Sequence, residues 1–489
     1  MLTLVNTNRM LPPIAPIALD YIAGHIRREG LEVEILDLNM AGDPRAALSD
    51  YFAKAQPELV GLSFRNSDDC FWPSAQWFAP GLAETVRTIR TLTDAPVVLG
   101  GVGFSIFAEP IMAMSGADFG IHGDGEEALV ALVRELRNGR RFDRVPGLIW
   151  RGARQGESRL ADGGAAQPSF HRNPPAWPRE LVLPTSRSEV DNRYYYENGG
   201  QLGFETKRGC DRSCAYCADP LAKGRFGRLR RPAEVADELQ TLAVQGFDVL
   251  HTCDCEFNVP GDHAAAVCDE LIGRGLGERV RWYAYLAVVP FGPDLAAKMA
   301  RAGCVGINFT VDSVNDAMLA RYRQPHRRED IIRAVALCRE HGIRCMFDLL
   351  LGGPDETPET AAETIDLIQR IGPDCAGASL GVRLYPGTPI AQRVLAEAAP
   401  ETNPGIRRKY EGPIDLFQPT FYISPQLGPQ PAQLVRDLIA GDQRFFEPAL
   451  EANETGHDHN YNDNRELTDA IRNGARGAYW DILRQLRSV

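Results

Sequence analysis

The chain of 489 residues has an acidic but otherwise ordinary globular composition. Its 53 Lys and Arg residues against 65 Asp and Glu residues give a formal net charge of −12, which disfavours binding to the phosphate backbone of a nucleic acid. Hydrophobic residues make up 44% of the chain and charged residues 24%, so a folded core is expected and disorder is not. No apolar run reaches the ~20 residues that a bilayer-spanning helix needs, so no membrane partner is expected.

The N-terminus and the cysteine content indicate the compartment. Residues Met1–Pro13 lack a basic stretch, a long apolar segment and a small-residue cleavage site, so they are interpreted as a first β-strand and not as a signal peptide. A reducing cytoplasm is therefore predicted. The 11 cysteines, an odd number, are then not expected to form a disulfide framework, which raises the question of metal or cluster ligation. Five of them lie in apolar helix or strand contexts and are expected to be core thiols, namely Cys268, Cys304, Cys338, Cys345 and Cys375.

Residues 1–150 alternate between short β-rich runs and amphipathic helical stretches. Such alternation predicts an α/β domain with a Rossmann-like open parallel sheet and helices on both faces. The expected strands are Leu2–Asn6, Glu32–Leu38, Leu59–Phe64, Pro96–Leu99 and Asp118–His122. The expected helices are Ile17–Glu29, Ala75–Leu92, Pro110–Met114 and Glu126–Asn138.

Residues 151–200 interrupt this alternation and are expected to be a linker, because Gly152–Pro178 is rich in Gly, Arg, Ala and Pro and has no period. Alternation resumes over 201–395, where six strand–helix repeats predict a partial parallel barrel and not an eightfold one. Residues 396–489 are expected to form a small, mostly helical C-terminal region. The expected barrel strands are Leu202–Lys207, Val249–Cys253, Arg281–Ala284, Gly306–Val311, Arg344–Leu350 and Ala378–Leu384.

The motif that carries the clearest chemistry is Cys210-Asp-Arg-Ser-Cys214-Ala-Tyr-Cys217, directly after the first expected barrel strand. Three thiolates on one loop can ligate three irons of a [4Fe–4S] cluster, because soft sulfur ligands suit iron–sulfur chemistry. The fourth iron is then open to a substrate. A zinc site is one alternative, and it would need a fourth protein ligand, for which Cys253 or Cys255 is the best candidate. Three unrelated buried cysteines are the other alternative.

With Tyr216 just before its third cysteine, the motif resembles that of the radical S-adenosylmethionine superfamily. Further matches fall at expected strand ends over about residues 201–395, so the resemblance implies a partial (β/α)6 barrel with the cluster on Cys210, Cys214 and Cys217. Tyr216 is then expected to lie beside the bound cofactor.

The same resemblance assigns contacts to S-adenosylmethionine. Asp254 and Glu256 occupy the segment that holds the methionyl amino group, Asp312 the position that contacts the ribose, and Glu356 a segment resembling the G-x-P-x-E-T signature beside the adenine. Asp254-Cys255-Glu256 departs from the usual Gly-Gly-Glu. A plain strand-end carboxylate at the barrel mouth is therefore the alternative for Asp254 and Glu256.

The first half resembles the cobalamin-binding domain that precedes the barrel in one large class of this superfamily. The likeness rests on Pro12-Pro13 before the first expected helix, on Ser63 and Gly100-Gly101 at strand ends, and on the turn Gly123-Asp124-Gly125-Glu126. It implies that Ser63, Gly100, Gly101, Gly123, Gly125 and Glu126 contact cobalamin. Glycine at a carboxyl strand end lets a planar cofactor approach the backbone. A plain turn, or an anion site at a helix start, is the alternative for these glycines.

One departure concerns the cobalt ligand. The loop Asn6–Pro16 contains no histidine, unlike the D-x-H-x-x-G motif of cobalamin mutases and methionine synthase. The resemblance therefore implies that the lower face of cobalt has another ligand or none. Arg65 is a candidate to line that face, and an ordinary loop arginine paired with Asp68 or Asp69 is the alternative.

Together these likenesses imply a cobalamin-dependent radical S-adenosylmethionine enzyme and favour a C-methyltransferase of a small or natural-product-like molecule. A radical derived from S-adenosylmethionine would activate a substrate carbon, and cobalamin would supply the methyl group. An external one-electron reductant of the flavodoxin or ferredoxin type is expected as partner.

A cyclisation, rearrangement or ring contraction without net methylation is the alternative reaction. A non-catalytic cobalamin or cluster sensor is the alternative outside enzymes, but it has no need of a cleavable co-substrate. His457 and His459 are expected to lie in a solvated polar loop rather than in a metal site.

Overall fold

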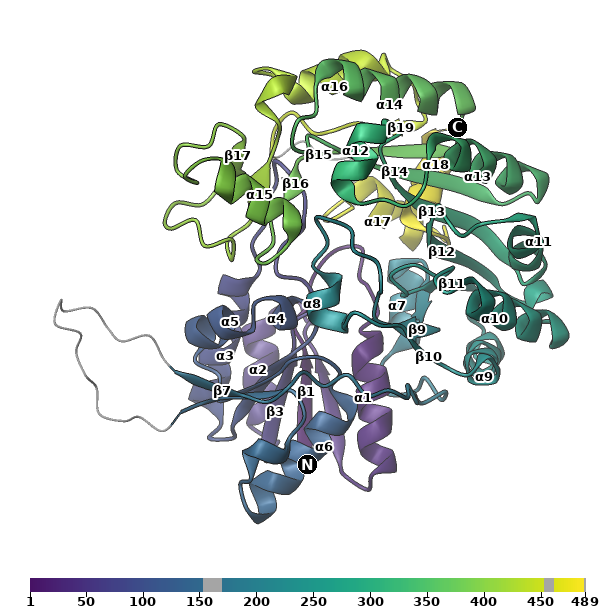
Figure 1. Cartoon of the computed structure of the whole chain (residues 1–489). Coiled ribbons are helices and arrows are strands. Elements are labelled where there is room, and N and C mark those ends of the chain that lie inside the picture. The colour runs from purple at the N-terminus through teal and green to yellow at the C-terminus, as the bar shows by residue number, and fades with distance from the viewer. Residues whose placement is uncertain (153–168, 453–460, 488–489) are drawn as a thin grey trace.

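The computed structural model describes residues 1–152, 169–452 and 461–487, so His457 and His459 lie outside the described residues. Two seven-stranded sheets, each with helices packed on it, make up most of the chain. In Figure 1 the purple and blue N-terminal half lies at the bottom and the teal and green half lies above it. None of the described helices is long and apolar enough to cross a bilayer.

The N-terminal sheet confirms the predicted Rossmann-like architecture. Its order is β2-β1-β3-β4-β5-β6-β7, with the first five strands parallel and the last two joined antiparallel at one edge. Its strands are β1 (Leu2–Asn6), β2 (Val33–Asp37), β3 (Leu59–Ser63), β4 (Val97–Gly100), β5 (Phe119–Ile121), β6 (Leu148–Arg151) and β7 (Phe170–Arg172). Its helices are α1 (Ile17–Arg28), α2 (Pro44–Phe52), α3 (Ala79–Leu92), α4 (Val102–Ile106), α5 (Ala108–Ser115) and α6 (Glu126–Asn138).

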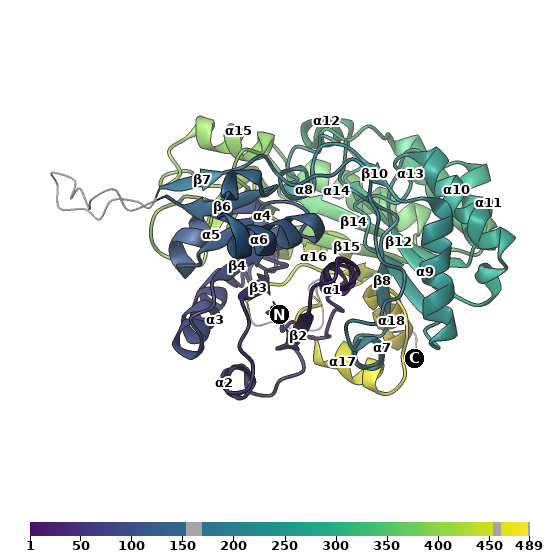
Figure 2. The same ribbon diagram turned by 90° about the horizontal axis from the view of Figure 1, so that it is seen from below.

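The interval 151–200, expected to be a linker, contains ordered elements in its described part. β7 pairs with β6 and so belongs to the N-terminal sheet. Helix α7 (Asn192–Gly199) buries Tyr195 and Tyr196 and packs against the C-terminal helix α17 (Arg465–Arg472), as Figure 2 shows from below. The absence of a sequence period reflects their shortness, because three or eight residues are too few for a period to show.

The second sheet is the predicted partial barrel with one strand more than expected. Its order is β8-β11-β12-β13-β14-β15-β19, all parallel. Its strands are β8 (Leu202–Phe204), β11 (Val249–Thr252), β12 (Arg281–Ala287), β13 (Cys304–Asp312), β14 (Arg344–Leu351), β15 (Cys375–Leu380) and β19 (Phe445–Phe446). Its main helices are α9 (Pro232–Val244), α10 (Gly261–Gly273), α11 (Pro293–Arg301), α13 (Arg328–Glu340) and α14 (Pro358–Ile371).

Shorter elements surround the second sheet. The hairpin β9 (Lys207–Arg208) and β10 (Arg228–Leu229) flanks the cysteine loop, and β16 (Val382–Arg383), β17 (Ile406–Arg408) and β18 (Thr420–Tyr422) form a small antiparallel sheet. The remaining helices are α8 (Asp219–Lys223), α12 (Asp316–Tyr322), α15 (Pro389–Glu397), α16 (Pro431–Ile439) and α18 (Tyr479–Arg487).

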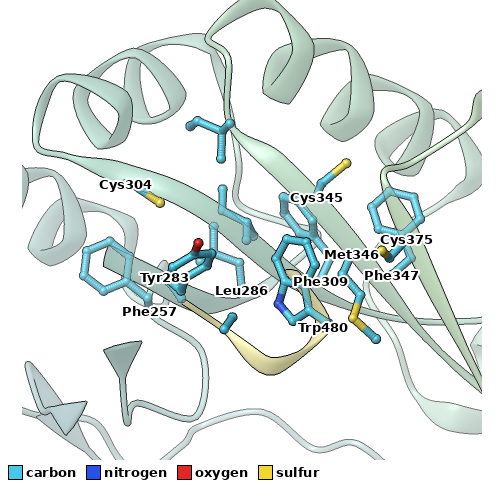
Figure 3. Close-up of a cluster of buried hydrophobic side chains, with 14 of the residues drawn as sticks. Phe257, Tyr283, Leu286, Cys304, Phe309, Cys345, Met346, Phe347, Cys375 and Trp480 are labelled. Carbon is cyan, nitrogen blue, oxygen red and sulfur yellow. The ribbon is translucent and has the colours of Figure 1, made fainter. Parts of the chain in front are cut away.

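The C-terminal helix α18 helps to close the core of the second sheet. Trp480 lies among the aromatic side chains of the strands in Figure 3, and the Tyr283 hydroxyl donates to Asp481 at 2.9 Å. Cys304, Cys345 and Cys375 lie in the same buried cluster, in agreement with the interpretation of these thiols as core residues.

Candidate cofactor site between the two sheets

A cavity of about 780 Å³ lies where the carboxyl ends of the two parallel sheets meet. Ligands of open α/β sheets and of parallel barrels bind at this end, so the cavity is the candidate cofactor site. Its walls come from both halves and from the C-terminal region. They include Asn6, Ser63, Arg65, Gly100, Gly101, Gly123, Gly125 and Glu126 from the first half, His251, Cys253, Asp254, Cys255 and Tyr285 from the second, and Tyr461, Asn462, Tyr479 and Trp480 from the C-terminal region.

The glycine pair at the end of β4 serves two different purposes. Gly101 has a φ of +105°, and a Cβ atom there would lie 2.5 Å from the Phe64 carbonyl oxygen, so this position packs backbone against backbone. A Cβ atom on Gly100 would meet nothing within 4 Å. Gly100 is therefore the position where a missing side chain leaves room in the cavity, and this cradle fits a large planar cofactor.

The second glycine motif also combines packing with cavity lining. Gly123 has a φ of +104°, and a Cβ atom on it would lie 2.5 Å from the Ala176 carbonyl oxygen. The backbone N–H of Gly123 donates to Ser105 Oγ at 3.2 Å. A Cβ atom on Gly125 would lie 2.9 Å from Ile22 Cδ1 on α1. Both glycines thus bring the turn close to its neighbours, and both line the cavity.

The two carboxylates of this turn are committed to the other half of the chain. Asp124 forms an ion pair with the buried Arg228, and Glu126 lies 2.9 Å from Arg208 Nη1. Arg208 also lies 3.3 Å from Asp124 and pairs with Glu205 at 2.8 Å. Arg208 comes two residues before Cys210. Glu126, expected to contact a cofactor, therefore ties the cobalamin-type turn to the start of the cysteine loop.

Arg65 enters the cavity from the loop after β3. Burial raises the pKa values of Tyr285 and Tyr479, and the nearby Arg65 guanidinium opposes that rise at both phenols. Asp68, one of the two predicted alternative partners of Arg65, pairs instead with the buried Arg383 at 3.0 Å. Arg65 thus points toward the space that a cofactor would fill.

Histidines near the cavity do not come from the first loop. Residues Asn6–Pro16 contribute to the wall and contain no histidine. His122 Nε2 instead hydrogen-bonds the Leu221 carbonyl oxygen at 2.6 Å. His251 lines the barrel side, where its Nδ1 lies 2.7 Å from the Thr252 carbonyl oxygen and burial lowers its pKa to about 4.

The cysteine loop is fixed by backbone hydrogen bonds at its start and in its interior. The Cys210 N–H donates to the Gly224 carbonyl oxygen at 3.1 Å, and the Ala215 N–H donates to the Tyr322 carbonyl oxygen at 2.9 Å. Cys210 is buried, and Cys214 and Cys217 are half-buried. In the described part of the chain, no three His, Cys, Asp or Glu side chains converge on a point that one metal ion could occupy. A [4Fe–4S] cluster spreads its ligands over several irons, so three thiols on one loop suit it.

A fourth thiol, Cys255, lies beside this loop. A hydrogen bond from Cys255 holds the pKa of Cys210 below its usual range, at about 6. Cys255 Sγ also lies 2.9 Å from Asp219 Oδ2 and 3.5 Å from Lys223 Nζ. These contacts bring polar groups of α8 to the base of the cysteine loop.

Asp254 and Glu256, at the end of β11, differ in their environment. Asp254 accepts hydrogen bonds from the Thr206 N–H at 2.8 Å, the Thr206 hydroxyl at 2.5 Å and the Lys207 N–H at 3.2 Å, so it anchors the segment that leads into the cysteine loop. Glu256 accepts one bond from the Thr310 hydroxyl at 3.0 Å. Its Oε2 is buried without a hydrogen-bond partner among the described residues, and burial raises its pKa to about 8. An ammonium group such as that of S-adenosylmethionine would satisfy this oxygen.

Asp312, at the end of β13, lies beside the cysteine loop. Its φ of +59° is rare for a non-glycine residue and turns its carboxylate toward Tyr216, whose hydroxyl donates at 2.9 Å. Gln324 Nε2 donates to the same carboxylate at 2.5 Å and lies 3.5 Å from Cys214 Sγ. Burial raises the pKa of Asp312 to about 7. Gln324 belongs to no motif and was therefore not predicted from the sequence.

Glu356 is fully buried in the turn after β14. One of its oxygens accepts the Gly352 N–H, and the other has no partner among the described residues. Burial raises its pKa to about 7. The carboxyl group therefore shapes the Gly352–Glu356 turn from within.

Two family models match the regions just described. One described as the B12 binding domain matches residues 5–133, and one described as the Radical SAM superfamily matches residues 204–368. The first match spans the parallel strands of the N-terminal sheet from within β1 to β5, and the second spans β11 to β14 of the other sheet.

Relatives cover the whole chain. The tryptophan 2-C-methyltransferase of Streptomyces laurentii is 30% identical, over 99% of this chain and 96% of the relative. A structure of the radical S-adenosylmethionine methyltransferase TsrM from Kitasatospora setae, with tryptophan substrate and a SAM analog (aza-SAM) bound, is 32% identical with a TM-score of 0.89, over 100% of this chain and 97% of that one. A second TsrM structure, with cobalamin and a [4Fe–4S] cluster bound, has a TM-score of 0.86 and 31% identity over the same shares. The chain therefore belongs to the cobalamin-dependent radical S-adenosylmethionine C-methyltransferases, and its cofactors are a [4Fe–4S] cluster, S-adenosylmethionine and cobalamin.

Proposed function

We propose that this enzyme transfers a methyl group from S-adenosylmethionine to a carbon atom of tryptophan or of a closely related indole. The observation that carries the proposal is a cavity lined by both sheets, because methyl donor, cobalamin and acceptor must meet in one space. Asp254 and Cys255 belong to its lining, whereas the described lining does not include the three cysteines, Glu256 or Asp312. Aromatic groups from β11, β12 and α18 line its barrel side, namely His251, Tyr285, Tyr479 and Trp480. An indole ring packs favourably against such surfaces. The full-length similarity to a tryptophan 2-C-methyltransferase supports the same acceptor.

Within this function the cysteine loop holds the cluster. Cys210, Cys214 and Cys217 are its proposed ligands, supported by their spacing on one loop and by the backbone bonds that fix that loop. When bound, the cluster, S-adenosylmethionine and cobalamin supply the electron-transfer and methyl-transfer chemistry that side chains lack. The protein contributes orientation and the exclusion of water.

Four side chains are proposed to orient S-adenosylmethionine. The unpaired Oε2 of Glu256 accepts the methionyl ammonium, and Asp312 with Tyr216 receives the ribose hydroxyls. Glu356 keeps its turn in shape beside the adenine. Asp254 acts indirectly, because it accepts the N–H groups of Thr206 and Lys207 and so anchors the segment that leads into the cysteine loop.

The first half is proposed to hold cobalamin over its strand ends. Gly100 leaves the space for the ring, and Ser63, Gly101, Gly123, Gly125 and Glu126 complete the wall. Arg65 would line the lower face of a bound cobalamin, and a cation without a free electron pair cannot ligate cobalt.

We further propose that the enzyme works in the cytoplasm with an external one-electron donor of the flavodoxin or ferredoxin type and without a nucleic-acid partner. The donor is needed because the cluster and cobalt must be reduced before use. All 11 cysteines of the chain are free of disulfides, which fits a reducing compartment. The net charge of −12 is unfavourable for nucleic acid.

The test is methylation by the reconstituted enzyme under anaerobic reduction. S-Adenosylmethionine with a ¹³C-labelled methyl group is supplied together with equal amounts of tryptophan, tyrosine and phenylalanine, and the products are analysed by mass spectrometry. We expect labelled methyltryptophan alone, with the label on carbon by NMR. Label in another amino acid, or in none while an extract of small molecules is methylated, would overturn the assignment of tryptophan and leave the methyltransferase class intact.

A further inference from the structure

One side chain bridges the cysteine loop and the strand end proposed for the ribose. Gln324 Nε2 lies 3.5 Å from Cys214 Sγ, 2.5 Å from Asp312 Oδ2 and 3.3 Å from the Tyr216 hydroxyl. An amide nitrogen carries two hydrogens, so it can donate to the sulfur and to the carboxylate at once. None of the roles described above uses this residue.

The end of α12 holds the amide in place. Arg323 adopts a left-handed conformation with a φ of +58°, which ends the helix, and the Gln324 N–H donates to the Leu319 carbonyl oxygen at 2.9 Å. The preceding residue, Tyr322, accepts the Ala215 N–H from within the cysteine loop at 2.9 Å. The Tyr216 and Tyr322 rings also meet edge to face, with centroids 5.8 Å apart. The backbone of Gln324 is thus tied to the loop that its side chain contacts.

We propose that Gln324 is a positioning residue that raises the reduction potential of the cluster by donating an N–H to the Cys214 thiolate. Hydrogen bonds to cluster sulfurs withdraw electron density and stabilise the reduced state. The second N–H of the amide orients Asp312, so one side chain links a cluster ligand to the carboxylate beside bound S-adenosylmethionine. The proposal rests on the proposed ligation of the cluster by Cys214.

The geometry separates this role from simple neutralisation of a buried carboxylate. Asp312 already accepts the Tyr216 hydroxyl at 3.0 and 2.9 Å on its two oxygens. An amide needed only for Asp312 would not have to lie within reach of sulfur. The amide lies between the two groups, which is the arrangement that a shared donor requires.

The experiment is a redox titration of the reconstituted protein with titanium(III) citrate as reductant, followed by electron paramagnetic resonance. The variants are Gln324→Met, which keeps the length and removes both donors, and Gln324→Lys, which replaces them with a cation. Gln433→Met is the matched control, because the Gln433 amide on α16 contacts Asp437, far along the chain from the cysteines. Iron and sulfide contents are measured for each protein.

We expect all variants to keep full cluster content. At a fixed solution potential, Gln324→Met should lower the ratio of reduced to oxidised cluster by about tenfold. This corresponds to a fall of ~59 mV in the reduction potential of a one-electron couple. Gln324→Lys should move the potential in the opposite direction, which a purely structural role would not do. Gln433→Met should match the wild type. Unchanged potentials in both Gln324 variants, or shifts of the same sign in both, would overturn the proposal. Loss of the cluster from the Gln324 variants would also overturn the proposal and would identify Gln324 as a structural residue. If instead Cys214 were not a cluster ligand, Cys214→Ala would keep its full cluster content.

Discussion

At the scale of single residues, the three thiols of one loop are the proposed ligands of the cluster. Changing Cys210, Cys214 or Cys217 to alanine should abolish the visible iron–sulfur absorbance and all turnover of S-adenosylmethionine, because each removes one of three charged ligands. Cys268→Ala is the matched control, since Cys268 is a core thiol on α10 with no access to the loop.

The neighbouring thiol Cys255 offers a substitute ligand when Cys210 is removed, which would mask the loss of the cluster. Cys255 hydrogen-bonds Cys210, so Cys210→Ala is also measured with Cys255→Ala in the same chain. If any single variant other than Cys210→Ala, or the double variant, kept the full iron content of the wild type, the ligand assignment would be wrong.

Glu356 gives the stability of the cofactor-free protein a defined pH dependence. Burial raises the pKa of Glu356 to about 7, so the folded protein keeps a proton that the unfolded chain has already lost at pH 6. The stabilisation from this group is therefore fully present below the ordinary glutamate pKa of ~4.3 and is lost as the pH rises through 7, by at most ~4 kcal/mol.

The comparison that isolates this effect is Glu356→Gln. The variant should melt near the wild-type temperature at pH 5 and above it at pH 8, because glutamine keeps an acceptor for the Gly352 N–H and never ionises. The other buried carboxyls titrate in both proteins and cancel in the difference. Melting temperatures that run parallel across this range would contradict the assignment.

At the scale of elements, a buried ionic network joins α1 to the second half of the chain. Glu238 on α9 accepts Arg187 at 2.7 Å, Arg230 at 2.5 Å and the Tyr21 hydroxyl at 2.7 Å, and Arg187 also pairs with Asp20 at 2.8 Å. All these charged side chains are at most 1% exposed. The network therefore fixes α1, and with it the loop that lines the cavity.

Glu238→Gln should leave two buried guanidinium groups without full compensation and lower the free energy of unfolding by ~3–5 kcal/mol. Cobalamin retention should fall with it. Glu234→Gln on the same helix is the control, since its partner Arg231 is 79% exposed and such a pair is worth at most ~1 kcal/mol. Thermal melts of both variants check the prediction, and equal effects would refute it.

Most of the parallel strands could be predicted from the sequence, because buried strands separated by amphipathic helices have a strong local pattern. β1 and α6 match their expected ranges. β19 was missed because a two-residue strand exists only through its pairing with β15. α2 was missed although Asp43 caps it, since only Leu48 and Phe52 are buried along its nine residues.

The candidate site was predictable to the extent that its residues form motifs. The cysteines stand at a specific spacing, and Glu256 and Asp312 follow strands whose ends were recognised. Gln324 could not be found, because its place depends on how α12 ends and on the loop across from it. The difference between Gly100 and Gly101 was also hidden, since it depends on the Phe64 carbonyl group packed against only one of them.

At the scale of the whole molecule, the cavity predicts how cobalt is ligated. Its first-half wall is lined by Asn6 and residues 10–16, and the loop Asn6–Pro16 contains no histidine, whereas His251 lies on the barrel side at β11. Electron paramagnetic resonance of the Co(II) form should therefore show no nitrogen splitting from a protein imidazole. Splitting that disappears in His251→Gln would show the opposite, that the barrel side supplies a ligand.

The central claim is that both sheets open onto one cavity in which cobalamin and the other two cofactors act together. Gly100→Trp tests it most directly, because position 100 faces open space in that cavity, whereas a side chain at Gly101 would collide with backbone. The measurement is transfer of labelled methyl from S-adenosylmethionine to the acceptor, alongside the cobalamin and iron contents of each protein. The account predicts that Gly100→Trp keeps its cluster, loses cobalamin and transfers no label. Full methyl transfer by a protein that holds a cluster but no cobalamin would contradict it.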